Sequence, residues 1–124
     1  MIVVDSSGWV EFFTDGVLAD QYARRLRNLQ LVVTPAIVIY EVYKRLKREL
    51  GEDDALIAVS AMQRSRVVPI SQELALAAAD LSLQHGLAMA DALILATAQS
   101  FDAELVTSDR DFERVVGVTY LAKT

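Results

Sequence analysis

Short runs of β-branched residues alternate along the chain with longer segments in which apolar positions have helical spacing. The short runs predict strands, and they are MIVVD (1–5), LVVT (31–34), RVVPI (66–70), AELVT (103–107) and VTYL (118–121). Strands that alternate with helices are typical of an α/β fold. We therefore expect a single three-layer domain over residues 1–124, in which helices flank a mainly parallel sheet.

Capping residues suggest where the helices begin. Ser6 or Ser7 is a candidate N-cap for the first helix, and Ser71 is one for the fifth. Thr34 is expected to cap a long helix that has Pro35 at its first position. The predicted helices cover about 6–14, 17–28, 35–50, 52–64, 72–85 and 91–101.

The segment LAMADALILATAQ (87–99) is almost entirely apolar or small, yet it carries the carboxylate of Asp91. Burial of a lone ionised carboxylate is prohibitive unless its charge is compensated. Backbone amides, a basic side chain or a metal ion would each supply compensation. Taken alone, Asp91 is most simply interpreted as the N-cap of its own helix.

Three other acids stand at or beyond predicted strand ends. Asp5 ends the first strand, Asp109 follows the fourth, and Glu41 lies about two turns into the helix that follows the second. Binding sites in parallel α/β sheets form beyond the carboxyl ends of the strands. Asp5, Glu41, Asp91 and Asp109 are therefore predicted to converge in one cleft, with Asp111 close by.

Each acid also has a purely structural interpretation. Asp5 would close a strand-to-helix turn, and Glu41 would pair with Arg45 one helical turn further on. Asp109 and Asp111 would be turn or cap residues. As a cluster they are harder to explain in this way, because two carboxylates 5 Å apart repel by about 3 kcal/mol at an effective dielectric near 20. Hard oxygen ligands without His or Cys favour Mg²⁺ or Mn²⁺ as the compensating cation.

Composition changes this picture only in part. The chain has no cysteine, which excludes disulfides and thiolate metal sites. Its formal charge of −5 argues at first against a nucleic-acid partner. Setting the four acids aside leaves −1, so the remaining surface is nearly neutral.

A hydrophobic content of 53% makes self-association plausible. The N-terminus lacks the basic region of a signal peptide, and no apolar run is long enough to cross a bilayer. We expect a cytoplasmic protein without a membrane partner.

Four stretches of the chain resemble the PIN domain, and within it the VapC-type ribonuclease toxins of toxin–antitoxin pairs. They are VVDSSGWVEFF at the start, Glu41 in the third helix, MADALILATA from Met89, and VTSDRDF near the end. The resemblance implies an acidic quartet of Asp5, Glu41, Asp91 and Asp109 around one or two Mg²⁺ or Mn²⁺ ions. Ser6 and Thr107 match its small hydroxyl positions, and Asp111 matches a variable fifth acid.

The resemblance further implies a metal-dependent endoribonuclease that leaves a 5′-phosphate and a 3′-hydroxyl. We assign Asp5, Asp91 and Asp109 as direct metal ligands, and Glu41 as a ligand or water positioner. The implied partners are an RNA substrate, a VapB-type antitoxin and a second copy of the chain. Two basic runs, Arg24–Arg27 and Lys44–Arg48, are either phosphate contacts or solvated helix faces. Trp9 and His85 are interpreted as structural.

Other classes of protein fit less well. A receiver-like signalling domain would need adjacent acids after the first strand, where this chain has Asp5-Ser6. A haloacid-dehalogenase-type phosphatase would need a second acid at residue 7, which is Ser. A PIN module that binds RNA without cleaving it remains open, and cleavage of a phosphate ester with added Mn²⁺ would distinguish it from an enzyme.

Overall fold

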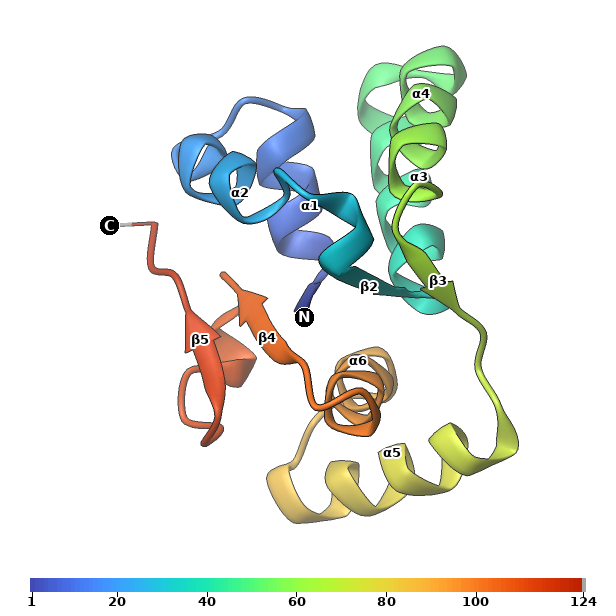
Figure 1. The fold of residues 1–124 in the computed structure, drawn as a ribbon, viewed down its shortest axis with the longest axis vertical. Coiled ribbons are helices and arrows are strands. Elements are labelled where there is room, and N and C mark those ends of the chain that lie inside the picture. Colours follow the sequence, from blue (N-terminus) through green and yellow to red (C-terminus); the bar gives the residue numbers. More distant parts are fainter. Residues whose placement is uncertain (124) are drawn as a thin grey trace.

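The computed structural model describes residues 1–123, and its central feature is a parallel β-sheet (Figure 1). All strand pairs in this part of the chain are parallel, and the strand order is β3-β2-β1-β4-β5. The strands are β1 (Ile2–Val4), β2 (Val32–Pro35), β3 (Arg66–Val68), β4 (Glu104–Thr107) and β5 (Val118–Tyr120). The predicted α/β fold is confirmed, and each predicted strand is present.

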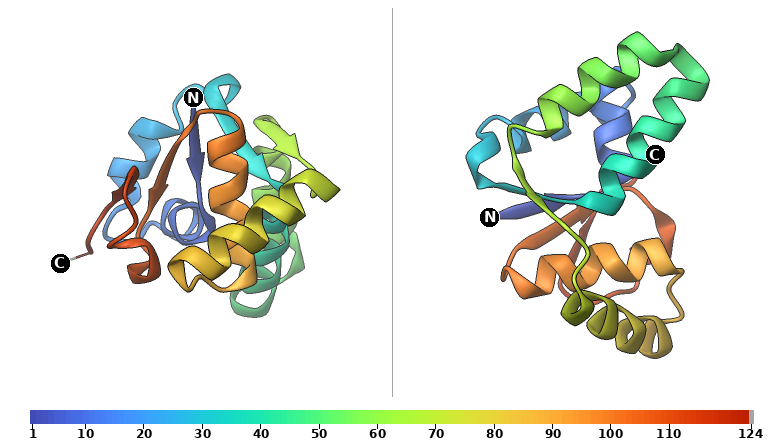
Figure 2. Two further views of the ribbon diagram at one scale, coloured as in Figure 1. Left: turned by 90° about the horizontal axis from the view of Figure 1, so that it is seen from below. Right: turned by 90° about the vertical axis from the view of Figure 1, so that its right-hand side faces the viewer.

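Helices cover both faces of the sheet. In the right-hand view of Figure 2, α1 to α4 lie on one side of the strands and α5 and α6 on the other. The α-helices are α1 (Ser6–Phe13), α2 (Ala19–Arg25), α3 (Ala36–Leu50), α4 (Glu52–Met62), α5 (Gln72–His85) and α6 (Met89–Ser100). Two short 3₁₀ helices, η1 (Leu29–Leu31) and η2 (Arg110–Phe112), precede β2 and follow β4. The expected three layers are therefore present.

Two of the predicted N-caps are wrong. Asp5, rather than Ser6 or Ser7, caps α1, because its carboxylate accepts a hydrogen bond from the Gly8 amide at 3.2 Å. Thr34 lies inside β2, where it is buried, and its hydroxyl is 2.6 Å from that of Ser65. A side chain engaged in this way is not available to α3. The Ser71 cap of α5 is confirmed.

The N-cap interpretation of Asp91 is also wrong. Helix α6 begins at Met89 with Ala88 at its N-cap, so Asp91 is the third residue of the helix. It faces the site rather than closing the helix end. Residues 92–98 are all buried, and α6 packs under the sheet as a core element. Within residues 1–123 no single helix could span a membrane by length and hydropathy, and α5 and α6 meet those criteria only as a pair bent by 114°.

The strand order fixes the location of the site. From β1 the sheet continues to β2 and β3 on one side and to β4 and β5 on the other, so its order reverses between β1 and β4. Val4 pairs with Val106 in parallel register, and the Asp5 amide donates to the Val106 carbonyl at 3.3 Å. The residues that follow β1 and β4 therefore leave the sheet side by side. This is the switch point at which α/β proteins place their ligands.

Candidate functional site

Asp5 occupies the centre of this switch point and is almost completely buried. One of its carboxylate oxygens accepts hydrogen bonds from the Ser7 hydroxyl at 2.6 Å and the Gly8 amide at 3.2 Å. The other accepts from the Thr107 hydroxyl at 2.5 Å, at the end of β4. The Asp5 carboxylate is thus held by donors from both the β1–α1 turn and β4.

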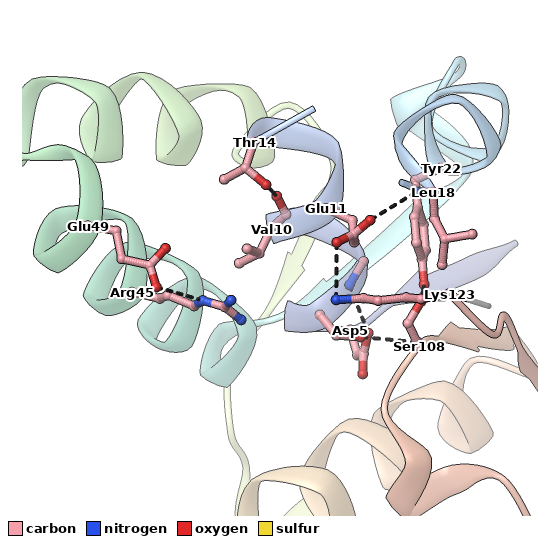
Figure 3. A network of polar contacts seen from close by, with 12 residues as sticks. Asp5, Val10, Glu11, Thr14, Leu18, Tyr22, Arg45, Glu49, Ser108 and Lys123 are labelled. Carbon is pink, nitrogen blue, oxygen red and sulfur yellow. Dashed lines mark hydrogen bonds and ion pairs between the residues drawn. The ribbon is translucent and has the colours of Figure 1, made fainter. Parts of the chain in front are cut away.

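The loop after β4 carries two more acids and is tied to the same turn. The Ser108 amide donates to the Ser7 hydroxyl, and the Ser108 hydroxyl lies 2.6 Å from that of buried Tyr22 (Figure 3). Asp109 caps η2, since its carboxylate accepts from the Asp111 amide at 2.9 Å. The cap role expected of Asp109 is confirmed, and it leaves the carboxylate at the edge of the site.

Asp91 completes a compact group with these two acids. Each of Asp91, Asp109 and Asp111 offers one carboxylate oxygen within 4.8 Å of the others. Asp91 is half-buried, and no hydrogen bond to its carboxylate is formed by residues 1–123. The predicted metal ligands include Asp91 and Asp109 but not Asp111, which was matched only to a variable fifth acid. Its spacing of two residues from Asp109 was the available signal.

Glu41 reaches the site from α3 and does not form the ion pair that was one structural interpretation of it. Its carboxylate accepts a hydrogen bond from the Ser6 hydroxyl at 3.0 Å. Arg45 instead pairs with Glu49 at 3.3 Å, as Figure 3 shows. The Glu41–Arg45 interpretation is therefore wrong. Ser6 directly follows Asp5 in the chain, so its hydrogen bond connects Glu41 to the turn that carries Asp5.

The acids destabilise one another's charged forms. Burial raises the pKa of Asp5 to about 6, against the opposing hydrogen bonds from Ser7, Thr107 and Gly8. The pKa of Asp91 rises to about 7, first because of burial and then because of the negative charges of Asp109, Asp111, Asp5 and Glu41. Burial also raises the pKa of Glu41, and the charge of Asp109 adds to this effect. All five acids therefore share one electrostatic environment.

No positive side chain neutralises this environment in the described part of the chain. The ion pairs there join Arg45 and Arg48 to Glu49, Lys47 to Glu52, and Lys123 to Glu11, and none includes a site acid. Carboxylates in a cluster without a cation partner have the donor chemistry that suits Mg²⁺ or Mn²⁺. The triad of Asp91, Asp109 and Asp111 could hold such an ion.

A cleft of about 350 Å³ opens beside the acids. Ser6, Ser7, Glu41 and Asp109 line it together with residues of α3 that include three cations. The basic run Lys44–Arg48 thus adjoins the site, through Lys44, Arg45 and Arg48. Arg24 and Arg25 of the other run bond backbone carbonyls of their own helix, and neither lines this cleft.

The fold and the acid cluster together define an α/β domain with a candidate metal site at the switch point of a parallel sheet. The chain belongs to the PIN domain family, whose family model matches residues 2–118. The predicted resemblance is therefore confirmed. No curated protein matches the chain significantly.

Solved structures with the same fold include toxins of VapBC pairs. A toxin–antitoxin complex from Klebsiella pneumoniae is 26% identical, with a TM-score of 0.80, and the match covers 100% of this chain and 98% of that one. VapC20 of Mycobacterium tuberculosis, a toxin that cleaves the sarcin-ricin loop, is 23% identical over 95% of this chain and 97% of its own, with a TM-score of 0.77. VapBC2 of Rickettsia felis, bound to promoter DNA, is 20% identical over 98% of both chains, with a TM-score of 0.75.

We expect the metal-free domain to become less stable as the pH rises from about 5 to about 8. The folded state raises the pKa of Asp5 to about 6 and that of Asp91 to about 7, from 3.8 in each case. In this range the folded state holds protons that the unfolded chain has released, so the free energy of unfolding falls as the pH rises. Urea melts in EDTA across this range measure the effect.

The comparison variant for this experiment is Asp91→Asn, which should reduce the pH dependence because it removes one of the groups whose pKa is raised. Asp91→Asn should also be more stable than the wild type at pH 8 without metal, since one repulsive charge is gone. A wild-type stability that increased with pH over this range would contradict the clustering of the acids.

Proposed function

We propose that this chain is a metal-dependent endoribonuclease, the VapC-type toxin of a toxin–antitoxin pair. The observation that carries the proposal is the acid triad at the switch point of a PIN domain, in which three carboxylates lie within 4.8 Å of one another without a cation partner among the described residues. VapC20, a relative of the same fold that cleaves the sarcin-ricin loop, supports it.

The residues have distinct roles in this proposal. Asp91, Asp109 and Asp111 would hold Mg²⁺ or Mn²⁺, and a bound ion of this kind activates water and neutralises charge on a phosphodiester. Asp5 remains a proposed ligand, because a carboxylate oxygen that accepts one hydrogen bond retains a second lone pair. Glu41, which accepts a hydrogen bond from Ser6, would orient the attacking water or act as a further ligand.

We also propose two protein partners. The first is a VapB-type antitoxin, as supported by relatives solved as toxin–antitoxin complexes. The second is another copy of the chain, in a homodimer that would bury on the order of 1,500 Å². Large apolar side chains exposed on α5 and α6, at Leu76, Leu83 and Met89, support self-association.

Millimolar Mn²⁺ should raise the thermal midpoint of the wild-type domain by several degrees. An ion that binds only the folded state stabilises it by about 2.7 kcal/mol at a hundredfold excess over Kd. Thermal melts with and without Mn²⁺ measure the shift. Asp109→Asn should lose it, whereas Glu113→Gln, an exposed acid outside the cluster, should keep it. Equal shifts in Asp109→Asn and wild type would argue against the site.

Asp5→Asn, Asp91→Asn and Asp109→Asn should each abolish Mn²⁺-dependent cleavage of RNA while circular dichroism shows an intact fold. Each substitution removes a negative charge that holds the ion but keeps the size of the side chain. Cleavage is followed on gels with end-labelled RNA, and the product ends are mapped to test for 5′-phosphate. A wild-type domain that binds RNA and Mn²⁺ without cleaving would instead be a non-catalytic PIN module.

An antitoxin should compete with Mn²⁺ for the acid cluster. We expect a basic antitoxin side chain, most simply Arg, to reach the carboxylates, because a guanidinium relieves the same repulsion as the ion. Titration of Mn²⁺ into the purified complex should release the antitoxin and restore nuclease activity in parallel. If saturating Mn²⁺ leaves antitoxin affinity unchanged, and Arg→Ala changes in the antitoxin have no effect, inhibition does not act through this cluster.

A further inference from the structure

The cleft beside the acids combines an aromatic ring with positive charges on one face of α3. Tyr40, Lys44 and Arg48 line it, as does Arg45. Tyr40 is 57% exposed, although it is a large aromatic residue directly next to half-buried Glu41. The Lys44 ammonium lies 5.4 Å from the centre of the Tyr40 ring and donates to its hydroxyl at 3.3 Å. The ring is thus held in place by its own helix rather than by the core.

Helical spacing arranges these residues as a track that leads away from the acids. Lys44 and Arg48 follow Glu41 by three and seven residues, or about 4.5 and 10.5 Å along the helix axis. Because residues three and four apart share a helix face, both cations lie on the side that carries Glu41. Figure 3 shows Arg45 on this helix, with its guanidinium directed towards α1 across the cleft.

In the described part of the chain, the positive side chains of this cleft form no ion pairs with the acid cluster. Among residues 1–123, Lys44 forms no ion pair, and Arg45 and Arg48 pair only with Glu49 at the solvent-exposed end of the helix. The cleft therefore presents exposed positive charge to an anion at the border of a site built from carboxylates. Lys47, on the same helix, pairs with Glu52 and does not line the cleft.

We propose that this cleft is a subsite for an unpaired nucleotide that flanks the cleaved phosphodiester, with its base stacked on Tyr40 and its phosphates at Lys44 and Arg48. This inference rests on the proposed nuclease function and adds the residues that would contact the nucleotide next to the cleaved bond. Bases in a duplex are stacked on one another and offer no free face to a side chain. Unpaired bases stack readily on exposed aromatic rings next to basic residues.

The test compares single-stranded and duplex RNA as ligands. The probe is a fluorescein-labelled 12-nucleotide RNA of mixed sequence, alone or annealed to its complement. Binding is measured by anisotropy with Mg²⁺ in the Asp91→Asn background, because Asp91 does not line this cleft and its loss should prevent cleavage. We expect the single strand to bind more tightly than the duplex.

Substitutions in the cleft should separate stacking from charge. Tyr40→Ala should weaken binding of the single strand by about 10- to 100-fold, while Tyr40→Phe stays close to the parent because the ring is kept. Lys44→Ala and Arg48→Ala should weaken binding and reduce the salt dependence of the affinity by about one phosphate contact each. Lys47→Ala is the matched control, and it should leave both quantities nearly unchanged.

Three results would overturn the subsite: no measurable binding, tight binding of the duplex, or unchanged affinity in Tyr40→Ala. If Tyr40→Ala weakened the antitoxin complex but not RNA binding, the cleft would belong to the antitoxin. Failure of the subsite can be distinguished from failure of the nuclease proposal. RNA that binds through Tyr40 but is not cleaved by the wild type with Mn²⁺ would refute the nuclease and leave the subsite in place.

Discussion

Negative charge gathered at one point of the sheet is the constraint on which the rest of this structure depends. The reversal of strand order between β1 and β4 brings Asp5 and Asp109 to the same edge, and α6 adds Asp91. Two such charges 5 Å apart repel by about 3 kcal/mol at an effective dielectric near 20. In the described chain the repulsion is not relieved by an ion pair, so the surrounding structure must hold the carboxylates in place.

Hydroxyl groups of Ser and Thr hold two of these carboxylates in place by hydrogen bonds. Thr107 and Ser7 donate to Asp5, and Ser6 donates to Glu41. The Thr107 and Ser6 bonds join elements that are distant in sequence, whereas the Ser7 bond closes a local turn. The Tyr22 and Ser108 hydroxyls anchor the loop that bears Asp109 and Asp111 against α2. Hydrogen bonds to a carboxylate favour its charged form, yet the pKa of Asp5 still rises to about 6 because burial has the larger effect. The carboxylates are thus held together at a cost to the stability of the fold.

Much of the fold followed from the sequence because strand and helix periodicities are local. The five strands were identifiable from β-branched runs, and the rule for parallel sheets pointed to the strand ends that Asp5 and Asp109 follow. The errors concern choices that tertiary contacts decide. Thr34 had a plausible local role as a cap, but Ser65 engages its hydroxyl in the fold. Glu41 had a plausible local partner in Arg45, but the Ser6 hydroxyl, distant in sequence, donates to Glu41 instead. The position of Asp111 in the triad depends on the turn at η2, and no periodicity in the sequence reports that turn.

The net charge of the whole chain is a poor guide to its partners, because it does not report where in the fold the charges lie. A formal charge of −5 disfavours a polyanion only if the acids are spread over the surface that would meet it. Here five acids share one site, and a bound divalent cation would reverse the local sign. Lys44, Arg45 and Arg48 of α3 line the same cleft as Glu41, so a single periodic element aligns them with the cluster. The distribution of charge along α3, rather than its sum over the chain, therefore makes an anionic substrate compatible with an acidic protein.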